Sequence, residues 1–297
     1  MKAETKNILP VYRRSSFMKP AFLYNRSLRR GAFILLFVVL SVFAGSLLTP
    51  HDILGMDPVN RLSAPNGSHW FGTDNVGRDV FSRVMYGVRL SLIIGFFVTA
   101  ISAALGLAVG LIVTYSKALD HILMRICDGL FAIPSILLAI ALMAALGQKP
   151  INVIIALILV FFPSIARVVR SQAMMIKEKV FIESLRAQGA NAFRIIFLHI
   201  APNVMSPLIV QVTHVFAASI LIEASLSFLG AGIPEPLPSL GNLMYDGKLA
   251  IYNAWWMTVF PGVFIVLIVL GLNLFGDGLR DYLDPKSKKL NGLEKAK

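Results

Sequence analysis

The segment ESLRAQGANAFRIIFLHIAP, residues 183–202, is a polar stretch within a largely apolar chain. An apolar stretch long enough to cross a bilayer lies on each side of it, at about 151–170 and 204–230. A polar segment between two crossings must leave the membrane. We therefore expect a membrane protein with a loop that is large enough to contact a soluble partner.

The spacing inside this loop predicts a helix, a turn and a second helix. Residues 181–188 favour a short helix, Gly189 can supply a left-handed stop, and residues 192–199 favour another helix before Pro202. The second helix would be amphipathic, which suits docking into a groove of a partner. Its apolar positions are Phe193, Ile196 and Phe197. A plain linker with basic residues is the alternative interpretation.

The composition places the whole chain in the membrane class. Of its 297 residues, 56% are hydrophobic and only 15% are charged, a balance that predicts a polytopic membrane protein. A net charge of +12 could suggest nucleic-acid binding, but the positions of the basic residues indicate membrane topology instead, and no nucleic-acid partner is expected. The single Cys127 excludes an intrachain disulfide and a thiolate cluster for zinc.

Apolar runs of about 20 residues predict an all-α membrane protein with six transmembrane helices. The first run follows a basic arm and lacks a small-residue cleavage site, so we interpret it as a retained anchor. The predicted spans are 31–49, 88–115, 124–146, 151–170, 204–230 and 255–278. The corresponding regions are a basic arm (1–30), the first helix with an external loop (31–87), a permease-like domain (88–285) and a basic tail (286–297).

The distribution of Lys and Arg predicts the orientation. Of the 28 basic residues, 22 fall in the two termini and in the segments around 116–125 and 167–194, which lie on one side of a six-span topology. The positive-inside rule places that side in the cytoplasm. Both termini and the loop at 183–202 are therefore expected to face the cytoplasm.

Five of the six spans contain residues that disturb a helix or let helices approach closely. Gly106 and Gly110 form a GxxxG pattern in the second span, and each later span contains a proline. These prolines are Pro134, Pro163, Pro207 and Pro261. Each residue alone fits ordinary tight packing, whereas together they favour a bundle that rearranges.

The loop resembles the EAA loop of ABC importer permeases. Glu183 opens the motif, Gly189 follows six residues later, and Pro202 closes it. The sequence departs from the family pattern at Ser184, Leu185 and Ala201, and it retains the Glu, Gly and Pro framework. The residues to which this resemblance assigns ATPase coupling are Glu183, Ser184, Leu185, Gly189, Phe193, Ile200 and Pro202.

The resemblance extends over most of the chain, from about residue 30 to residue 285. Residues 71–92, FGTDNVGRDVFSRVMYGVRLSL, are similar to the signature of the oligopeptide, dipeptide and nickel branch of these permeases. Further similar segments are ASLSFLGAGIPEPLPSLGNLM (224–244) and LNLFGDGLRDYLDP (272–285). As a set these segments are specific to the branch, whereas one EAA-like match alone is not.

The resemblance implies a type I importer subunit in a bacterial or archaeal cell membrane. It implies a homologous second permease, two cytoplasmic ABC ATPase subunits that hold ATP and Mg, and an extracytoplasmic substrate-binding protein. This chain has no G-x-x-x-x-G-K-[ST] phosphate loop, so we expect no ATPase site, no cofactor and no enzymatic activity of its own. Peptides are the expected cargo, and nickel or a metal chelate is the alternative.

Ionisable residues in the fifth span are candidate functional groups. Ser219, Glu223 and Ser227 recur every four residues and so share one helix face, which we expect to line the translocation path or the second permease. The alternative is that Glu223 bonds to a neighbouring helix and never meets substrate. His214 points to another side of the helix and is interpreted as a packing residue, and no metal site is predicted.

Outside the membrane, residues 75–87 are predicted to form an amphipathic surface helix, and the loop before Trp255 and Trp256 is predicted to form an ordered interfacial segment.

Two other function classes predict different sequence patterns. An ion-coupled secondary transporter predicts inverted repeats around midplane charges, and a membrane enzyme predicts converging acid, base, nucleophile or metal residues. The sequence displays neither pattern, which favours the importer permease.

Overall fold

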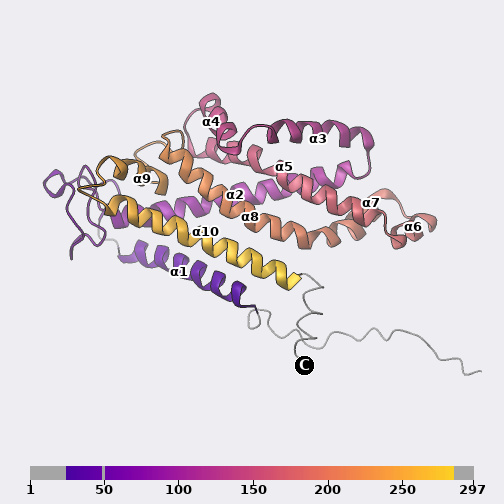
Figure 1. Ribbon diagram of the computed structural model, residues 1–297, viewed down its shortest axis with the longest axis horizontal. Coiled ribbons are helices and arrows are strands. Elements are labelled where there is room, and N and C mark those ends of the chain that lie inside the picture. The colour runs from indigo at the N-terminus through magenta and orange to yellow at the C-terminus, as the bar shows by residue number, and fades with distance from the viewer. Residues whose placement is uncertain (1–24, 49–50, 284–297) are drawn as a thin grey trace, which may run out of the picture.

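The chain folds into an elongated bundle of long helices that run roughly alongside one another (Figure 1). The computed structural model describes residues 25–48 and 51–283, so most of the predicted N-terminal arm and all of the predicted basic tail lie outside the described residues. The helices are α1 (Arg26–Leu48), η2 (Pro58–Asn60), α2 (Val80–Val113), α3 (Lys117–Phe131), α4 (Ser135–Leu146), α5 (Pro150–Lys177), α6 (Val180–Ala187), α7 (Ala192–Arg194), η3 (Ile195–Ile200), α8 (Ala201–Phe228), α9 (Leu240–Leu249) and α10 (Trp256–Leu283).

The predicted membrane topology is confirmed except at its third span. Among the described residues, five helices are long and apolar enough to cross a bilayer, and a sixth crossing exists if α3 and α4 form one span. The predicted third span, 124–146, is not one straight helix, because α3 and α4 meet at a bend of 95° beside Pro134, the residue that the sequence indicated as a disturbance of this span. Pro134 immediately precedes α4 and cannot donate the backbone hydrogen bond that a continuous helix needs.

The amphipathic surface helix predicted at 75–87 is also wrong. Residues 75–79 form a turn, and Asp79 caps the N-terminus of α2 by accepting a hydrogen bond from the backbone N–H of Ser82. Val80, Val84 and Val88, whose spacing of four residues suggested one face of a surface helix, are fully buried in the first turns of α2. The second membrane helix therefore begins eight residues earlier than its apolar run.

The predicted close approach at the GxxxG pattern is confirmed. A Cβ atom added to Gly106 would lie 2.6 Å from Cγ2 of Ile165, and one added to Gly110 would lie 2.6 Å from Cβ of Val169. Both contacts are with α5, the helix on which α2 packs most extensively. The two glycines thus set the distance between the backbones of α2 and α5.

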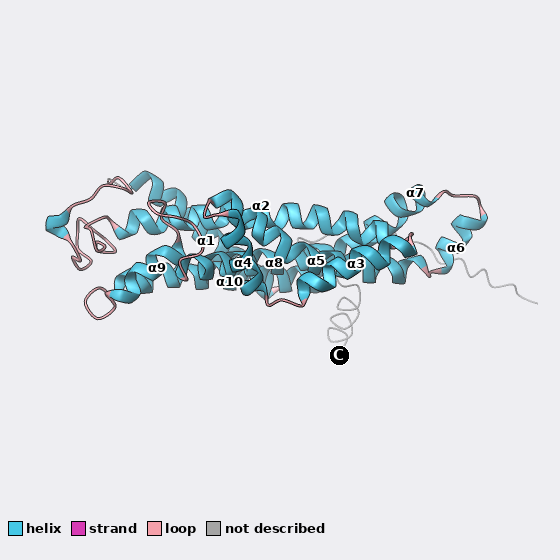
Figure 2. Ribbon diagram, turned by 90° about the horizontal axis from the view of Figure 1, so that it is seen from above, coloured by secondary structure: helices cyan, strands magenta, loops and turns pink. Residues whose placement is uncertain are grey.

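Two hydrophobic cores hold the bundle together. The first joins α2, α4, α5, α6, η3 and α8, and the second joins α1 and the outer half of α2 to α8, α9 and α10. In both ribbon views α9 lies toward one end of the bundle and α6 and α7 lie at the other (Figures 1 and 2). By the charge distribution, the end with α6 and α7 is cytoplasmic, and the end with α9 and residues 51–79 is extracytoplasmic.

Candidate functional site

The cytoplasmic end carries a compact segment from Val180 to Ile200, which we call the elbow. It consists of α6, a turn at residues 188–191, α7 and η3. Gly189 ends α6 with a left-handed φ of 81°, and its N–H donates to the carbonyl of Arg186 at 2.9 Å. The N–H of Ala190 donates to the carbonyl of Leu185 at 3.0 Å, which completes a Schellman motif. The left-handed stop predicted at Gly189 is confirmed.

The second half of the elbow differs from the sequence prediction. Residues 192–199 were expected to form a separate short helix, whereas α7, η3 and α8 run on without interruption from Ala192 to Phe228. Pro202 lies in the first turn of α8, where the missing N–H of proline is tolerated. The wide π-helical turn of η3 precedes it, and the N–H of Ala201 donates to the carbonyl of Ile196, five residues back. This shift accommodates the proline without a break.

The elbow buries one row of residues and exposes another. Ile182, Ile195 and Ile200 are buried and belong to the first core, so they attach the elbow to the bundle. Large apolar side chains on the other side are open to solvent: Phe193 is 70% exposed and stacks near Phe197 with a ring separation of 4.4 Å. Val180, Phe181 and Leu198 are also exposed. Exposed apolar groups of this size mark an interaction surface.

A basic and aromatic contact ties the elbow to the cytoplasmic end of α2. Nζ of Lys177 lies 4.9 Å from the ring centre of Tyr115. The guanidinium of Arg186 in α6 lies 6.0 Å from the same ring. Lys177 also donates to the carbonyl of Thr114, at the end of α2. The elbow is therefore connected to both helices that form the tightest pair of the bundle.

The structure places all the sequence-predicted coupling residues except Pro202 in the elbow, with Pro202 in the adjoining first turn of α8, and it does not expose them all. Glu183, Ser184, Gly189, Phe193 and Pro202 are exposed, Leu185 is half-buried and Ile200 is buried. Ser184 Oγ donates to the carbonyl of Val180 at 3.1 Å. Their role in coupling stays a prediction.

The three residues predicted to line a path in α8 lie inside the subunit. Ser219 and Glu223 have no exposed surface and Ser227 has 1%. One carboxylate oxygen of Glu223 accepts a hydrogen bond from Ser91 Oγ at 2.8 Å, and the other accepts one from Ser227 Oγ at 3.0 Å. This is the alternative arrangement, in which Glu223 bonds to a neighbouring helix. Their role in translocation stays a prediction.

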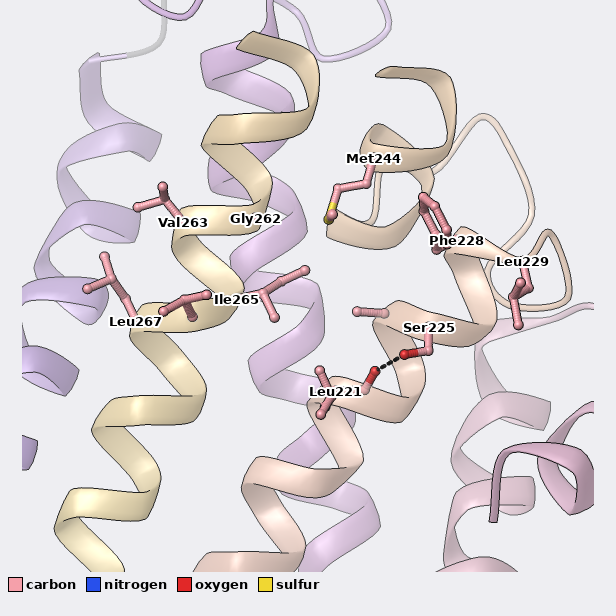
Figure 3. Close-up of a pocket in the computed structure, with 11 residues that line it drawn as sticks. Leu221, Ser225, Phe228, Leu229, Met244, Gly262, Val263, Ile265 and Leu267 are labelled. Carbon is pink, nitrogen blue, oxygen red and sulfur yellow. Dashed lines mark hydrogen bonds between the residues drawn. The ribbon is translucent and has the colours of Figure 1, made fainter. Parts of the chain in front are cut away.

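An open apolar cavity lies between α8, α9 and α10 in the outer half of the bundle (Figure 3). Its volume is about 660 Å³. The hydroxyl of Ser225 is directed to the carbonyl of Leu221 at 2.8 Å, so it offers the cavity little polarity (Figure 3). The lining residues are Leu221, Ala224, Ser225, Phe228, Leu229, Met244, Gly262, Val263, Ile265, Val266 and Leu267.

A pair of ionisable residues occupies the same face of α8 and α10 closer to the cytoplasm. Nε2 of His214 lies 3.8 Å from Oδ1 of Asp277, and these side chains are 40% and 59% exposed. At about 100° per residue, His214 lies within about 20° of Leu221 on α8, and Asp277 within about 20° of Val266 on α10. An ionisable side chain at membrane depth ordinarily faces protein or water. This pair makes the face a candidate for contact with another protein or with water.

The segment at 71–92 builds a cap over the extracytoplasmic end. Asp74 accepts a hydrogen bond from Nε of Arg78 at 2.6 Å and lies 3.7 Å from Nε of the buried Arg83. Nε1 of Trp256, at the start of α10, donates to the carbonyl of Thr73 at 3.0 Å. We call residues 51–79 together with α9 the external cap. It fastens the starts of α2 and α10 to one another.

One carboxyl of the external cap has a strongly altered acidity. Burial and, to a smaller extent, the neighbouring carboxylates of Glu235 and Asp74 raise the pKa of Asp246 in α9 to about 6, against the opposite effect of Arg83 and Arg78. Nη2 of Arg78 lies 3.9 Å from Oδ2 of Asp246. Desolvation of the charged form outweighs this distant ion pair.

Sequence reasoning missed two of these site residues. Asp277 lay inside the predicted sixth span, and its charge at membrane depth was a signal that could have identified it together with His214. Ser91 gave no such signal, because a serine in an apolar helix is unremarkable until its partner 132 residues away is known.

Comparison with known proteins places this arrangement among transport permeases. Residues 102–289 match the family described as "Binding-protein-dependent transport system inner membrane component". The chain is 46% identical over 253 residues to the dipeptide transport system permease protein DppC of Alkalihalophilus pseudofirmus, which covers 85% of this chain and 83% of that protein. It is 40% identical over 289 residues to the glutathione transport system permease protein GsiD of Pectobacterium atrosepticum, which covers 94% of this chain and 96% of that protein.

Solved structures support the fold. A chain from inward-facing conformations of the MetNI methionine ABC transporter aligns with a TM-score of 0.56 and 24% identity, covering 67% of this chain and 94% of that chain. A second crystal form of the same transporter aligns with a TM-score of 0.57. At this identity the likeness concerns the helical arrangement alone.

Proposed function

This chain belongs to the family of binding-protein-dependent transport system inner membrane components, and from that premise we propose that peptides are the solutes it imports. Membership makes the chain a multi-pass permease subunit and not a catalyst. The family implies ATPase and binding-protein partners. Relatives named for dipeptide and for glutathione transport support a peptide cargo, because glutathione is itself a small peptide.

The finer assembly is also part of the proposal. This subunit pairs with a homologous second permease, two ATPase subunits bind at the cytoplasmic side with ATP and Mg, and an extracytoplasmic protein delivers the peptide. ATP binding brings the ATPases together, moves the elbow and shifts the bundle between outward and inward openings. Such a shift requires that nucleotide bind the two states with different affinity.

The observation that carries the coupling role is the exposed apolar surface of the elbow. Phe193 and Phe197 form an aromatic pair that projects from the cytoplasmic end, and Ile182 fixes the same element to the core. A docked ATPase can therefore displace the elbow only by displacing the helices behind it. Glu183 is exposed beside this surface and supplies a charge for a basic group of the partner.

The coupling role is tested with two variants and one matched control. We expect Gly189→Pro and Glu183→Lys to insert and assemble, to reduce uptake at least tenfold, and to abolish the ATPase stimulation that the binding protein causes. Gly147→Pro is the control: Gly147 also has a positive φ, of 86°, also donates from its N–H to a helix carbonyl, at 2.9 Å to Met143, and has open space around it. Normal uptake in both elbow variants would overturn the coupling role.

We further propose that the face of α8 and α10 with the apolar cavity and the His214–Asp277 pair packs against the second permease. Facing lipid, an ionised side chain would lose its contacts with water and polar groups, which is costly inside the membrane. Contact with a second subunit covers the cavity and provides polar partners or water for the pair. The translocation path then runs beside this contact, and Glu223 acts behind it as a buried support.

Cysteine cross-linking tests the position of that contact. In a Cys127→Ser background, we expect Val266→Cys to cross-link to a cysteine of the second permease, because Val266 is 61% exposed beside the cavity. Phe33→Cys on α1, whose side chain is 71% exposed, is expected to remain unlinked. Cross-linking of Phe33→Cys alone would contradict the assignment.

The cargo is tested on the assembled transporter in proteoliposomes. We expect binding-protein-dependent, ATP-driven accumulation of a labelled dipeptide, tripeptide or glutathione, with each unlabelled peptide competing according to its affinity for the binding protein. Accumulation of labelled Ni²⁺ without any peptide would overturn the peptide proposal and would leave the permease assignment intact.

A further inference from the structure

The external cap brings together three potential metal-ligating side chains that are not adjacent in the sequence. His51, His69 and Asp79 each offer one donor atom, and the three donor atoms all lie within 4.8 Å of one another. From this juxtaposition we propose that the cap holds a binding site for a divalent transition metal, with Zn²⁺ as the representative ion. The proposal concerns a resident ion of the cap and is independent of the cargo.

The side chains are already arranged around a common point. Nδ1 of His69 lies 2.9 Å from Oδ1 of Asp79, and the rings of His51 and His69 face one another at 4.7 Å between centroids with an angle of 34°. Oδ2 of Asp79 is occupied by the N–H and hydroxyl of Ser82, at 2.8 Å and 2.7 Å. The carboxylate is therefore fixed in orientation, and its Oδ1 is the oxygen directed to the histidines.

The donor set selects the class of ion. Two imidazoles and one carboxylate suit Zn²⁺, Ni²⁺, Co²⁺ or Cu²⁺, whereas Mg²⁺ and Ca²⁺ prefer oxygen ligands. Zinc binds nitrogen and carboxylate oxygen at about 2.0 to 2.2 Å, so two atoms that ligate the same ion lie roughly 3.5 Å apart. Donor pairs near the 4.8 Å limit must close, whereas Nδ1 of His69 and Oδ1 of Asp79, at 2.9 Å, must separate if both ligate the ion. His51 can make the closing movement, because it is partly exposed and its ring contact is with His69 itself.

Burial distinguishes this site from a chance cluster of exposed side chains. The side chains of His69 and Asp79 are 12% and 4% exposed, so these two donors are held by the surrounding cap. If Oδ1 remains hydrogen-bonded to Nδ1 of His69, Asp79 orients that ring for metal binding through its other nitrogen. If Oδ1 ligates directly, it completes a set of three protein ligands with room for water. Either arrangement requires His51.

The site has a structural consequence for the cap. His51 follows α1, His69 lies in the middle of the external segment, and Asp79 is the N-terminal cap of α2. A bound ion would link the exit of the first span directly to the start of the second. We expect metal to stabilise the external cap against unfolding and not to take part in nucleotide chemistry at the opposite end.

Metal titration of the purified full-length chain tests the proposal. The protein is prepared with a tag free of histidine and stripped with a chelator, and Co²⁺ is added while its visible absorption is recorded. Zn²⁺ is then measured by competition with a chromophoric chelator. We expect one equivalent of metal to bind, with the Co²⁺ band displaced by Zn²⁺. His51→Ala should weaken binding at least tenfold.

His121→Ala is the matched control, because His121 lies on α3 at a distance in the fold from the external cap. It should leave affinity unchanged within twofold. His69→Ala tests a second ligand, and His51→Ala remains decisive should loss of the His69–Asp79 hydrogen bond impair folding. Absence of stoichiometric binding, or equal affinity in the wild type and in His51→Ala, would overturn the site. The measurement needs no transport, so its failure is distinct from failure of the proposed function.

Discussion

Ser91 on α2 donates a hydrogen bond of 2.8 Å to the carboxylate of Glu223 on α8, and both residues are fully buried. Ser227, one turn further along α8, donates to the other carboxylate oxygen at 3.0 Å. The acid group is thus held between two central helices by neutral hydroxyls. Since burying a carboxyl is costly unless its oxygens are bonded, the two serines determine whether this position tolerates Glu at all.

Removal of the Ser91 hydroxyl should destabilise the bundle. Ser91→Ala leaves one carboxylate oxygen of Glu223 without its donor, which costs roughly 1 to 3 kcal/mol. We expect a lower midpoint of thermal unfolding in detergent. Ser225→Ala is the control, because Ser225 Oγ donates its hydrogen bond to the carbonyl of Leu221 within its own helix. Equal midpoints for Ser91→Ala and Ser225→Ala would contradict the importance of this contact.

Glu223→Gln separates a charge-based role from a supporting one. Gln retains the size of the side chain and can still accept from Ser91 or Ser227. We expect uptake of every peptide to stay within about twofold of the wild type if Glu223 only supports the bundle. A selective loss for peptides with a free amino terminus, at normal protein level, would instead assign Glu223 to the translocation path.

Gly110→Ala should loosen the contact between α2 and α5. The added Cβ would lie 2.6 Å from Val169 and 2.8 Å from the backbone oxygen of Ala166, so α5 must move. We expect a loss of about 1 to 3 kcal/mol in unfolding free energy. Gly129→Ala has no atom within 4 Å of its new Cβ and should be neutral or slightly stabilising. Thermal unfolding of the two variants in parallel checks this expectation.

Asp246→Asn should change how stability depends on pH. The pKa of Asp246 is raised from 3.8 to about 6, so the native state holds a proton that the unfolded state releases in this range. Its contribution is therefore fully present below about pH 4 and is lost as the pH rises through 6. Asn cannot ionise. We expect the variant to match the wild type near pH 4 and to melt roughly 1 to 3 °C higher at pH 7.5.

The difference in melting midpoint between Asp246→Asn and the wild type, recorded across this pH range, is the informative quantity. The groups that face Asp246 are Glu235, Asp74, Arg78 and Arg83. A constant difference at every pH would mean that the ionisation of Asp246 does not contribute to the stability of the cap, and a lower midpoint of the variant at pH 7.5 would mean that the ion pair with Arg78 outweighs desolvation.

Phe193→Ser should weaken binding of the ATPase subunits. Phe193 is 70% exposed on the elbow, and its loss removes an apolar anchor from the surface proposed to dock. We expect co-purification of the ATPases to fall at least tenfold. Tyr252→Ser is the control, since Tyr252 is 99% exposed at the opposite end of the molecule. Equal loss in both variants would indicate a general defect in assembly.

Local chemistry made much of this fold predictable. Gly189 correctly predicted a left-handed turn, and Gly106 and Gly110 correctly predicted a close contact between helices. The lengths of the apolar runs correctly predicted the positions of the long helices. The errors arose where tertiary packing, and not the local sequence, determines the conformation. Val80 and Val84 looked like one face of a surface helix, although they are buried at the start of α2. Pro202 looked like a boundary, although the wide turn before it lets the helix continue.

The site was less predictable than the fold because its contacts join distant residues. Nothing in the neighbourhood of Ser91 indicates Glu223, and nothing near His51 indicates Asp79. Periodicity correctly placed Ser219, Glu223 and Ser227 on one face of α8, but it could not tell whether that face meets a neighbouring helix or an open surface. Only the packing of α2 against α8 resolves that orientation.

The helical segment from Ala192 to Phe228 continues without a break from the elbow to the extracytoplasmic end of the bundle. At 1.5 Å per residue its 37 residues reach about 55 Å, which exceeds the thickness of a bilayer. If, as proposed, an ATPase docks at Phe193, a tilt imposed there reaches Phe228 on the other side of the membrane without passing through a break between helices. The proposed coupling then needs no intermediate beyond the stiffness of this one helix.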